Sequence, residues 1–348
     1  MTSDTNPTGL RGIEFVEYCS KEHENLDQLF KAFGFSKLST NAEKDLIFYK
    51  QNDINFIVNN KLSGHTHNFV NDHGPSISSM AFRVENADKA FEVSVKNGAR
   101  AAEGEYTYKG KKVPAIYGIG DSLLYFVDKF EDKNFYQELG FIDDSVKEEI
   151  EGKGFIRIDH LTNNVYKGTM QKWTDFYKQT FGFTEVRYFD IKGAKTGLKS
   201  FALQSPCKTF CIPINEGTEA KSQINEYLEE YNGPGIQHIA FTSEDIVKSV
   251  ESLAATQIET LDIDDEYYDE VFDRVPNVTE DQVKLRKNNI LVDGDDEGYL
   301  LQIFTKNVIG PIFIEIIQRK NHDSFGEGNF GALFRSIEKD QEKRGYLD

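Results

Sequence analysis

The apolar positions of the second half of the chain predict a strand, an amphipathic helix and three further strands. The segment 156–161, with apolar residues at 156, 158 and 161, indicates the first strand. Apolar residues at helical spacing then predict a helix that ends at Gly182, a residue suited to a left-handed C-cap. Runs with β character follow at 185–190, 199–204 and 208–214. This segment therefore predicts one βαβββ module.

The same order of elements begins again at residue 237. A strand at 237–242 precedes a helix expected at 243–255, for which Ser243 is the candidate N-cap. Strands predicted at 300–305 and 312–318 complete this second module.

Short motifs of the first half recur in the second half in the same order. Ile13-Glu14-Phe15 corresponds to Ile158-Asp159-His160, and the segment 74–82 corresponds to 233–241. Two copies of one plan explain this order. We therefore predict an α+β protein with four βαβββ modules, in which each half forms an open β-barrel-like domain. The predicted domains are 1–150 and 151–348, with the charged stretch 129–153 as their connection.

Composition indicates a folded protein without a nucleic-acid or membrane partner. Its 348 residues suit two domains, and 39% hydrophobic residues supply their cores. A formal net charge of −18 argues against phosphate-rich partners. No apolar stretch reaches the length of a membrane span, and Met1 to Asn6 do not resemble a secretory signal. We therefore expect a cytoplasmic location.

The three cysteines, Cys19, Cys207 and Cys211, are too few for a disulfide framework and fit a reducing compartment. We expect them to be buried structural thiols, with Cys207 and Cys211 on one face of the same strand.

Two of the seven histidines stand out by their context. His160 and His238 each lie in the first strand of a module, between apolar residues, at equivalent positions of the repeat. This equivalence predicts that they face each other and share a ligand. A cluster of histidines at 65, 67 and 73 falls in a polar segment that we interpret as a surface loop.

Glu315 is the strongest metal-ligand candidate, because it is the one carboxylate in an otherwise apolar strand. A buried carboxylate needs a cation or a proton. The alternatives are a salt bridge with Arg319 or a position on an edge strand. Two imidazoles and one carboxylate are typical of iron(II) enzymes that bind a 2-oxo acid and dioxygen. Zinc enzymes can use the same residues, so the residue types leave the metal open.

The first half lacks these ligands. Aligning the repeats places Phe15 opposite His160 and Ser79 opposite His238. We therefore expect the first half to supply packing and an oligomer surface.

Several long motifs closely resemble the 4-hydroxyphenylpyruvate dioxygenase family of the vicinal-oxygen-chelate superfamily. They lie at 158–162, 235–240, 300–305, 313–319 and 325–330. The resemblance covers nearly the whole chain. It implies an iron(II) enzyme that converts 4-hydroxyphenylpyruvate, an aromatic 2-oxo acid, and dioxygen to homogentisate and carbon dioxide. It also implies a homo-oligomer, either a tetramer or a dimer, and a C-terminal helix that closes the pocket, with the glycines flanking Glu327 as a hinge.

The resemblance assigns a role to each matching residue. It implies that iron(II) is bound by His160, His238 and Glu315. It implies catalytic roles for Gln302, Phe304 and Asn329. It implies that the substrate is bound by Ser200, Asn215, Gln223, Gln237, Phe313, Phe325 and Phe330. Asn329 could instead cap the last helix.

Three other functions stay open at this point. A 4-hydroxymandelate synthase would use the same substrate, although an aromatic residue at Phe304 favours ring hydroxylation. A non-catalytic small-molecule-binding member of the superfamily would not need the ligand set. An extradiol catechol dioxygenase would use the same ligands but release no carbon dioxide.

Overall fold

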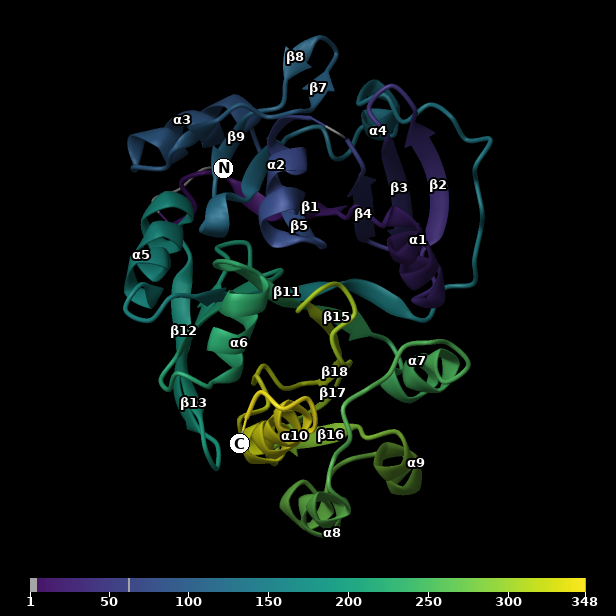
Figure 1. The fold of residues 1–348 in the computed structure, drawn as a ribbon, viewed down its shortest axis with the longest axis vertical. Coiled ribbons are helices and arrows are strands. Elements are labelled where there is room, and N and C mark those ends of the chain that lie inside the picture. Colours follow the sequence, from purple (N-terminus) through teal and green to yellow (C-terminus); the bar gives the residue numbers. More distant parts are fainter. Residues whose placement is uncertain (1–4, 62, 348) are drawn as a thin grey trace.

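The computed structural model describes residues 5–61 and 63–347, and it contains two eight-stranded sheets, one from each half of the chain (Figure 1). Residues 1–4, part of the segment considered above for a secretory signal, lie outside the described residues. The strand orders are β2-β3-β4-β1-β5-β10-β9-β6 and β12-β13-β14-β11-β15-β18-β17-β16.

The first half contains the elements up to residue 138. Its strands are β1 (Leu10–Cys19), β2 (Ser36–Asn41), β3 (Leu46–Gln51), β4 (Ile54–Asn59), β5 (Ser76–Val84), β6 (Ala101–Ala102), β7 (Thr107–Tyr108), β8 (Lys111–Lys112), β9 (Ala115–Tyr117) and β10 (Leu123–Val127). Its helices are α1 (His23–Ala32), α2 (Gly64–His73), α3 (Ala87–Lys96), the short 3₁₀ helix η1 (Ile119–Asp121) and α4 (Phe135–Glu138).

The second half begins with the long strand β11. Its strands are β11 (Phe155–Val165), β12 (Thr184–Lys192), β13 (Gly197–Gln204), β14 (Cys211–Gly217), β15 (Gly235–Ser243), β16 (Leu291–Gly294), β17 (Tyr299–Phe304) and β18 (Phe313–Lys320). Its helices are α5 (Met170–Phe181), α6 (Gln223–Glu230), α7 (Ile246–Leu253), α8 (Asp265–Arg274), α9 (Gln282–Lys287), the 3₁₀ helix η2 (Glu327–Asn329) and α10 (Phe330–Lys343).

Each sheet consists of two βαβββ modules placed side by side. The first strands of the two modules pair antiparallel at the centre, β1 with β5 and β11 with β15. Each of these strands also pairs parallel with the last strand of its own module. The predicted four-module α+β fold is therefore confirmed. Gly182 caps the C-terminal end of helix α5, as predicted, and its φ of 81° is in the left-handed region.

Three local predictions were wrong. The histidine-rich segment predicted as a loop forms helix α2. The helix predicted from residue 243 begins at Ile246, because the side chain of Asp245, not that of Ser243, accepts the backbone N–H of Lys248. Strand β14 begins only at Cys211, so Cys207 lies in the preceding turn, and both thiols are half-buried. The polar side chains next to Cys207 compete with strand formation before Cys211.

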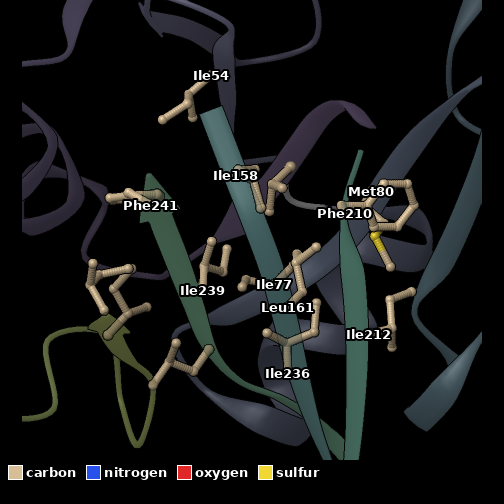
Figure 2. Close-up of a cluster of buried hydrophobic side chains, with 14 of the residues drawn as sticks. Ile54, Ile77, Met80, Ile158, Leu161, Phe210, Ile212, Ile236, Ile239 and Phe241 are labelled. Atoms are coloured by element: carbon tan, nitrogen blue, oxygen red, sulfur yellow. The ribbon is translucent and has the colours of Figure 1, made fainter. Parts of the chain in front are cut away.

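The two sheets pack against each other through a shared apolar core (Figure 2). Leu161 and Ile239 of the second sheet lie in it with Ile77 and Met80 of the first sheet. Phe241 packs against rings of the first half, with centroid distances of 6.2, 5.9 and 6.0 Å to Phe33, Phe35 and Phe56. One face of the second sheet therefore packs against the first half, and its opposite face is available for a functional site.

The C-terminal helix lies over that opposite face (Figure 1). Helix α10 contacts both β12 and α6, while η2 contacts β16. The curled second sheet and this helix therefore form a half-barrel with a lid. Among the residues that the structure describes, no helix combines the length and apolar character needed to cross a membrane.

Candidate metal centre

A β-bulge precedes each of the two central histidines. The ladder between β11 and β15 skips Asp159 on one strand and Gln237 on the other, so each is an extra residue. A bulge redirects the side chains around it. As a result, the side chains of Asp159 and Gln237 reach the Nδ1 atoms of His160 and His238, at 2.9 and 3.1 Å. Consecutive residues of a regular strand would point to opposite faces.

The outer nitrogens of the two imidazoles converge on Glu315. Nε2 of His160 lies 3.0 Å from Oε2 of Glu315 and 3.3 Å from Nε2 of His238. Nε2 of His238 lies 3.4 Å from the same carboxylate oxygen. The three side chains are nearly buried, with 4%, 9% and 4% of the surface of His160, His238 and Glu315 exposed. They form a group able to hold a metal ion.

The donor set fits a cation. If each Nδ1–H donates to its bulge residue, both Nε2 lone pairs and Oε2 of Glu315 point at one another without a hydrogen between them. Three buried acceptors at such distances repel unless a cation lies among them. Residues that hold the far nitrogen of a ligand histidine in this way are typical of metal sites.

The charges of the centre also call for a positive ion. Burial lowers the pKa of His160, but the carboxylates of Glu315 and Asp159 outweigh it and raise that pKa to about 9. Burial raises the pKa of Glu315, but the two imidazoles outweigh it and lower that pKa to about 2. For His238 burial dominates and lowers the pKa. Glu315 is therefore ionised, and without a metal the centre attracts a proton.

The predicted alternatives for Glu315 were wrong. Strand β18 lies between β15 and β17, so Glu315 is not on an edge. Arg319 binds Asp159, with Nε and Nη2 3.1 and 3.0 Å from its carboxylate oxygens. The guanidinium also donates to the carbonyls of His322 and Ser324. Arg319 therefore joins the support of His160 to the loop that precedes η2.

All thirteen residues singled out in the sequence line one cavity. It contains about 730 Å³ of atom-free space, including the solvent-filled space at its opening. Besides the three ligand candidates, its lining includes Gln302, Phe304, Asn329, Ser200, Asn215, Gln223, Gln237, Phe313, Phe325 and Phe330.

The walls near the ligand group are aromatic. The ring of Phe313 stacks on the imidazole of His238 at a centroid distance of 4.7 Å, and Phe304 packs edge-on against Phe313. Phe325 meets His160 edge-to-face at 5.9 Å. Phe189 of β12 completes this wall with contacts to Phe325 and Phe330. These rings shield the centre from water.

Polar groups come from the other side of the half-barrel. Ser200 of β13 and Asn215 of β14 are direct cross-strand neighbours. Gln223 begins α6, whose N-cap is Ser222. The lining thus combines an apolar wall with a few hydrogen-bonding side chains, which suits an aromatic ligand with polar ends.

The lid is fixed to the turn between β12 and β13. The buried carboxylate of Glu338 on α10 accepts backbone N–H groups from Ala194, Lys195 and Thr196 at 2.9–3.1 Å, and the hydroxyl of Thr196. The same helix contributes Leu333, Phe334 and Ile337 to the cavity, so Glu338 sets the position of one cavity wall.

The first half has aromatic residues where the second has His160 and Glu315. The ladder register pairs Phe15 with Ala81 as it pairs His160 with Ala240, which confirms the predicted correspondence. Tyr125 pairs with Ala81 as Glu315 pairs with Ala240. The rings of Phe15 and Tyr125 lie 6.1 Å apart in a core cluster. The first half therefore lacks the metal-binding group at this position.

Sequence reasoning missed several residues of the site. Asp159 and Arg319 lay inside motifs quoted for the resemblance, but Asp159 was given no role and Arg319 was considered only as a salt-bridge partner of Glu315. Phe189 carries only the signal of apolar periodicity, which core residues share. The C-terminal helix, by contrast, was expected from the resemblance to close the pocket, and its residues Leu333, Phe334 and Ile337 line the cavity. Tyr267 and Arg274 lie in α8, a helix between the first and second strands of its module, and no sequence signal marked them.

Comparisons with known families agree with this architecture. Residues 4–144 match a family model described as hydroxyphenylpyruvate dioxygenase, N-terminal. Residues 157–302 match the model of the glyoxalase, bleomycin resistance protein and dioxygenase superfamily.

Individual relatives extend over the full length. Protein MelA of Shewanella colwelliana is 56% identical over 100% of both chains. The 4-hydroxyphenylpyruvate dioxygenase of Pseudomonas aeruginosa is 44% identical and covers 98% of this chain and 97% of its own. A solved 4-hydroxymandelate synthase mutant from Streptomyces coelicolor has a TM-score of 0.82 over 96% of this chain and 99% of its own, and at 23% identity it shows a shared fold alone. With full-length relatives at this identity, the chain belongs to the 4-hydroxyphenylpyruvate dioxygenase family.

Proposed function

We propose that this protein converts 4-hydroxyphenylpyruvate and dioxygen to homogentisate and carbon dioxide, with iron(II) held by His160, His238 and Glu315. The observation that carries the proposal is the convergence of two Nε2 atoms and one carboxylate oxygen within 3.0–3.4 Å in an aromatic-walled cavity. Family membership supports the choice of substrate.

The ligand set suits an anionic 2-oxo acid. Two neutral imidazoles and one carboxylate leave a divalent ion with one net positive charge, which attracts the carboxylate of the substrate. The chemistry that iron(II) supplies when bound is chelation of the 2-oxo acid and activation of dioxygen. Three protein ligands leave room for both molecules.

The cavity residues would hold the substrate and exclude water. Phe313, Phe325 and Phe330 would enclose the ring, and a dry site protects a reactive oxidant from side reactions. We assign orientation of the polar ends of the substrate to Ser200, Asn215, Gln223 and Gln237. We assign direct contact with the reacting part of the substrate to Gln302, Phe304 and Asn329.

The test is to incubate the iron(II)-loaded protein with 4-hydroxyphenylpyruvate under air and to measure carbon dioxide release and the product. Homogentisate formation that disappears in His160→Ala and persists in His23→Ala supports the proposal, because His23 is exposed on α1. Release of 4-hydroxymandelate would show that the protein hydroxylates the benzylic carbon and not the ring. Substrate binding without dioxygen consumption would indicate a binding protein.

Three further assignments stay predictions of the sequence. These are the cytoplasmic location, the homo-oligomeric state and the division into domains at 1–150 and 151–348.

A further inference from the structure

A chain of hydrogen bonds leads from the metal-ligand candidate Glu315 to helix α8. The amide nitrogen of Gln302 donates to Oε1 of Glu315 at 3.0 Å. The amide nitrogen of Asn329 donates to Oε1 of Gln302 at 2.8 Å. The carbonyl oxygen of Asn329 then accepts from the hydroxyl of Tyr267 at 2.7 Å and from Nη2 of Arg274 at 3.3 Å.

The ends of this chain fix its direction. Arg274 only donates hydrogen bonds, and an ionised Glu315 only accepts them. Each of the two amides in between must therefore turn its oxygen toward Arg274 and its nitrogen toward Glu315. The reverse orientation would place the carbonyl of Gln302 against a carboxylate oxygen. Aligned amides next to a fixed charge polarise one another, so the chain is stronger than its separate bonds.

Burial and close packing leave the amides no alternative position. Gln302 and Asn329 are 3% and 1% exposed. A Cβ atom at Gly326 would lie 1.7 Å from Oε1 of Gln302, and one at Gly328 would lie 2.1 Å from Nη1 of Arg274. The glycines that flank Glu327 thus leave room for the side chains of Gln302 and Arg274. This is a structural reason for glycine at both positions, in addition to the predicted hinge.

Arg274 is itself held in place from several sides. Nη1 donates to the carbonyl of Gly328 at 2.7 Å, and Nη2 donates to the carbonyl of Val292 at 2.9 Å. The hydroxyl of Tyr267 accepts the backbone N–H of Val292 at 2.7 Å, and its single hydrogen is shared between Asn329 and the carbonyl of Val292, which lies 2.8 Å away. Helix α8 therefore presents two anchored donors to Asn329.

We propose that Arg274, supported by Tyr267, is a positioning residue that acts through Asn329 and Gln302 on Glu315. The chain occupies Oε1 of Glu315 and leaves Oε2 directed at His160 and His238. Glu315 would then offer the metal a single oxygen, which keeps one more coordination position open for small ligands. This inference rests on the metal site of the proposed function, but it concerns how the ligand is held and not which substrate is used.

The experiment titrates metal-free full-length protein with cobalt(II) and follows visible absorption, which reports both affinity and coordination number. The variants are Arg274→Gln, which removes the charge, and Tyr267→Phe, which removes one donor and keeps the ring. Arg335→Gln is the matched control, because Arg335 lines the same surface cleft as Arg274 but pairs with Asp264, at 3.8 Å, and not with Asn329 within the described part of the chain. Thermal midpoints of the metal-free proteins report folding.

We expect Arg274→Gln to weaken cobalt binding by about tenfold or more, as loss of support for metal ligands usually does. Its spectrum should shift as Oε1 of Glu315 becomes free to bind. Tyr267→Phe should show a smaller change of the same sign, and Arg335→Gln should match wild type.

The inference is overturned if folded Arg274→Gln and Tyr267→Phe proteins keep the wild-type affinity and spectrum. If Arg274→Gln does not fold, Tyr267→Phe decides alone. If the cobalt(II) titrations give the expected results but the iron(II)-loaded wild type forms no homogentisate, the proposed function is contradicted and this inference stands.

Discussion

Asp159 directly precedes His160 in the chain, yet its carboxylate oxygen lies 2.9 Å from Nδ1 of that imidazole. The bulge in β11 makes this possible, because the extra residue breaks the alternation of the strand. Burial opposes ionisation of Asp159, but the hydrogen bond from His160 and the charge of Arg319 outweigh it and hold its pKa below the ordinary value. Asp159 therefore fixes the Nδ1–H form of His160 and leaves Nε2 free as a ligand.

Replacement of Asp159 should weaken metal binding without removing a ligand. We expect Asp159→Ala to lower cobalt affinity by about 10- to 100-fold. Asp159→Asn should lose less, because its amide oxygen still accepts from Nδ1. Glu14→Gln is the control, since Glu14 is the bulge residue at the same position of the first half and binds Arg83. Equal affinity of folded Asp159→Ala and wild type would contradict the assignment.

Metal addition should stabilise the metal-free protein. A ligand that binds only the folded state at 100 times its dissociation constant adds about 2.7 kcal/mol to the free energy of unfolding. We expect iron(II), added without oxygen, to raise the thermal midpoint by several degrees. His160→Ala should abolish the shift, whereas His23→Ala should keep it. A shift that survives in His160→Ala would mean that the metal binds elsewhere.

Glu338→Gln should loosen the lid. Hydrogen bonds to a charged group contribute about 1.5–3 kcal/mol each, and the carboxylate accepts three backbone N–H groups from the β12–β13 turn. We expect amide hydrogen exchange at 194–196 to speed up by roughly tenfold or more. Glu342→Gln, which removes an exposed partner of Lys195, should change little. Unchanged exchange in Glu338→Gln would show that α10 is held by its apolar face.

Glu17 should make the first half sensitive to pH. It is buried and accepts from Tyr106, Ser78 and Thr66, but burial outweighs these bonds and raises its pKa. A raised pKa in the folded state means that the folded protein binds more protons than the unfolded one, so stability falls as pH rises above about 4.5. Glu17→Gln removes the ionisation.

The thermal midpoint of Glu17→Gln, relative to wild type, should therefore rise with pH across this window and then level off. The exposed Glu43→Gln should run parallel to wild type at every pH. A constant difference between Glu17→Gln and wild type would exclude the ionisation of Glu17 as the cause.

The sequence by itself determined the module order and the ligand candidates. Apolar periodicity located the strands, because side-chain direction repeats every two residues in a strand. The internal repeat placed His160 and His238 at equivalent positions, and an apolar strand made Glu315 conspicuous. The ladder register bore out this correspondence, down to Phe15 in the place of His160.

Only the tertiary structure decided how the ligand candidates are held. Gln237 and Asp159 reach Nδ1 atoms because of bulges, and a bulge depends on the register between two strands that lie far apart in the sequence. The contacts of Arg274 with Asn329 and of Asp159 with Arg319 span 55 and 160 residues. Local propensity does not encode such contacts, because they arise only when distant segments pack. The sequence thus named the residues of the centre, and the packing of distant segments gave them their orientation.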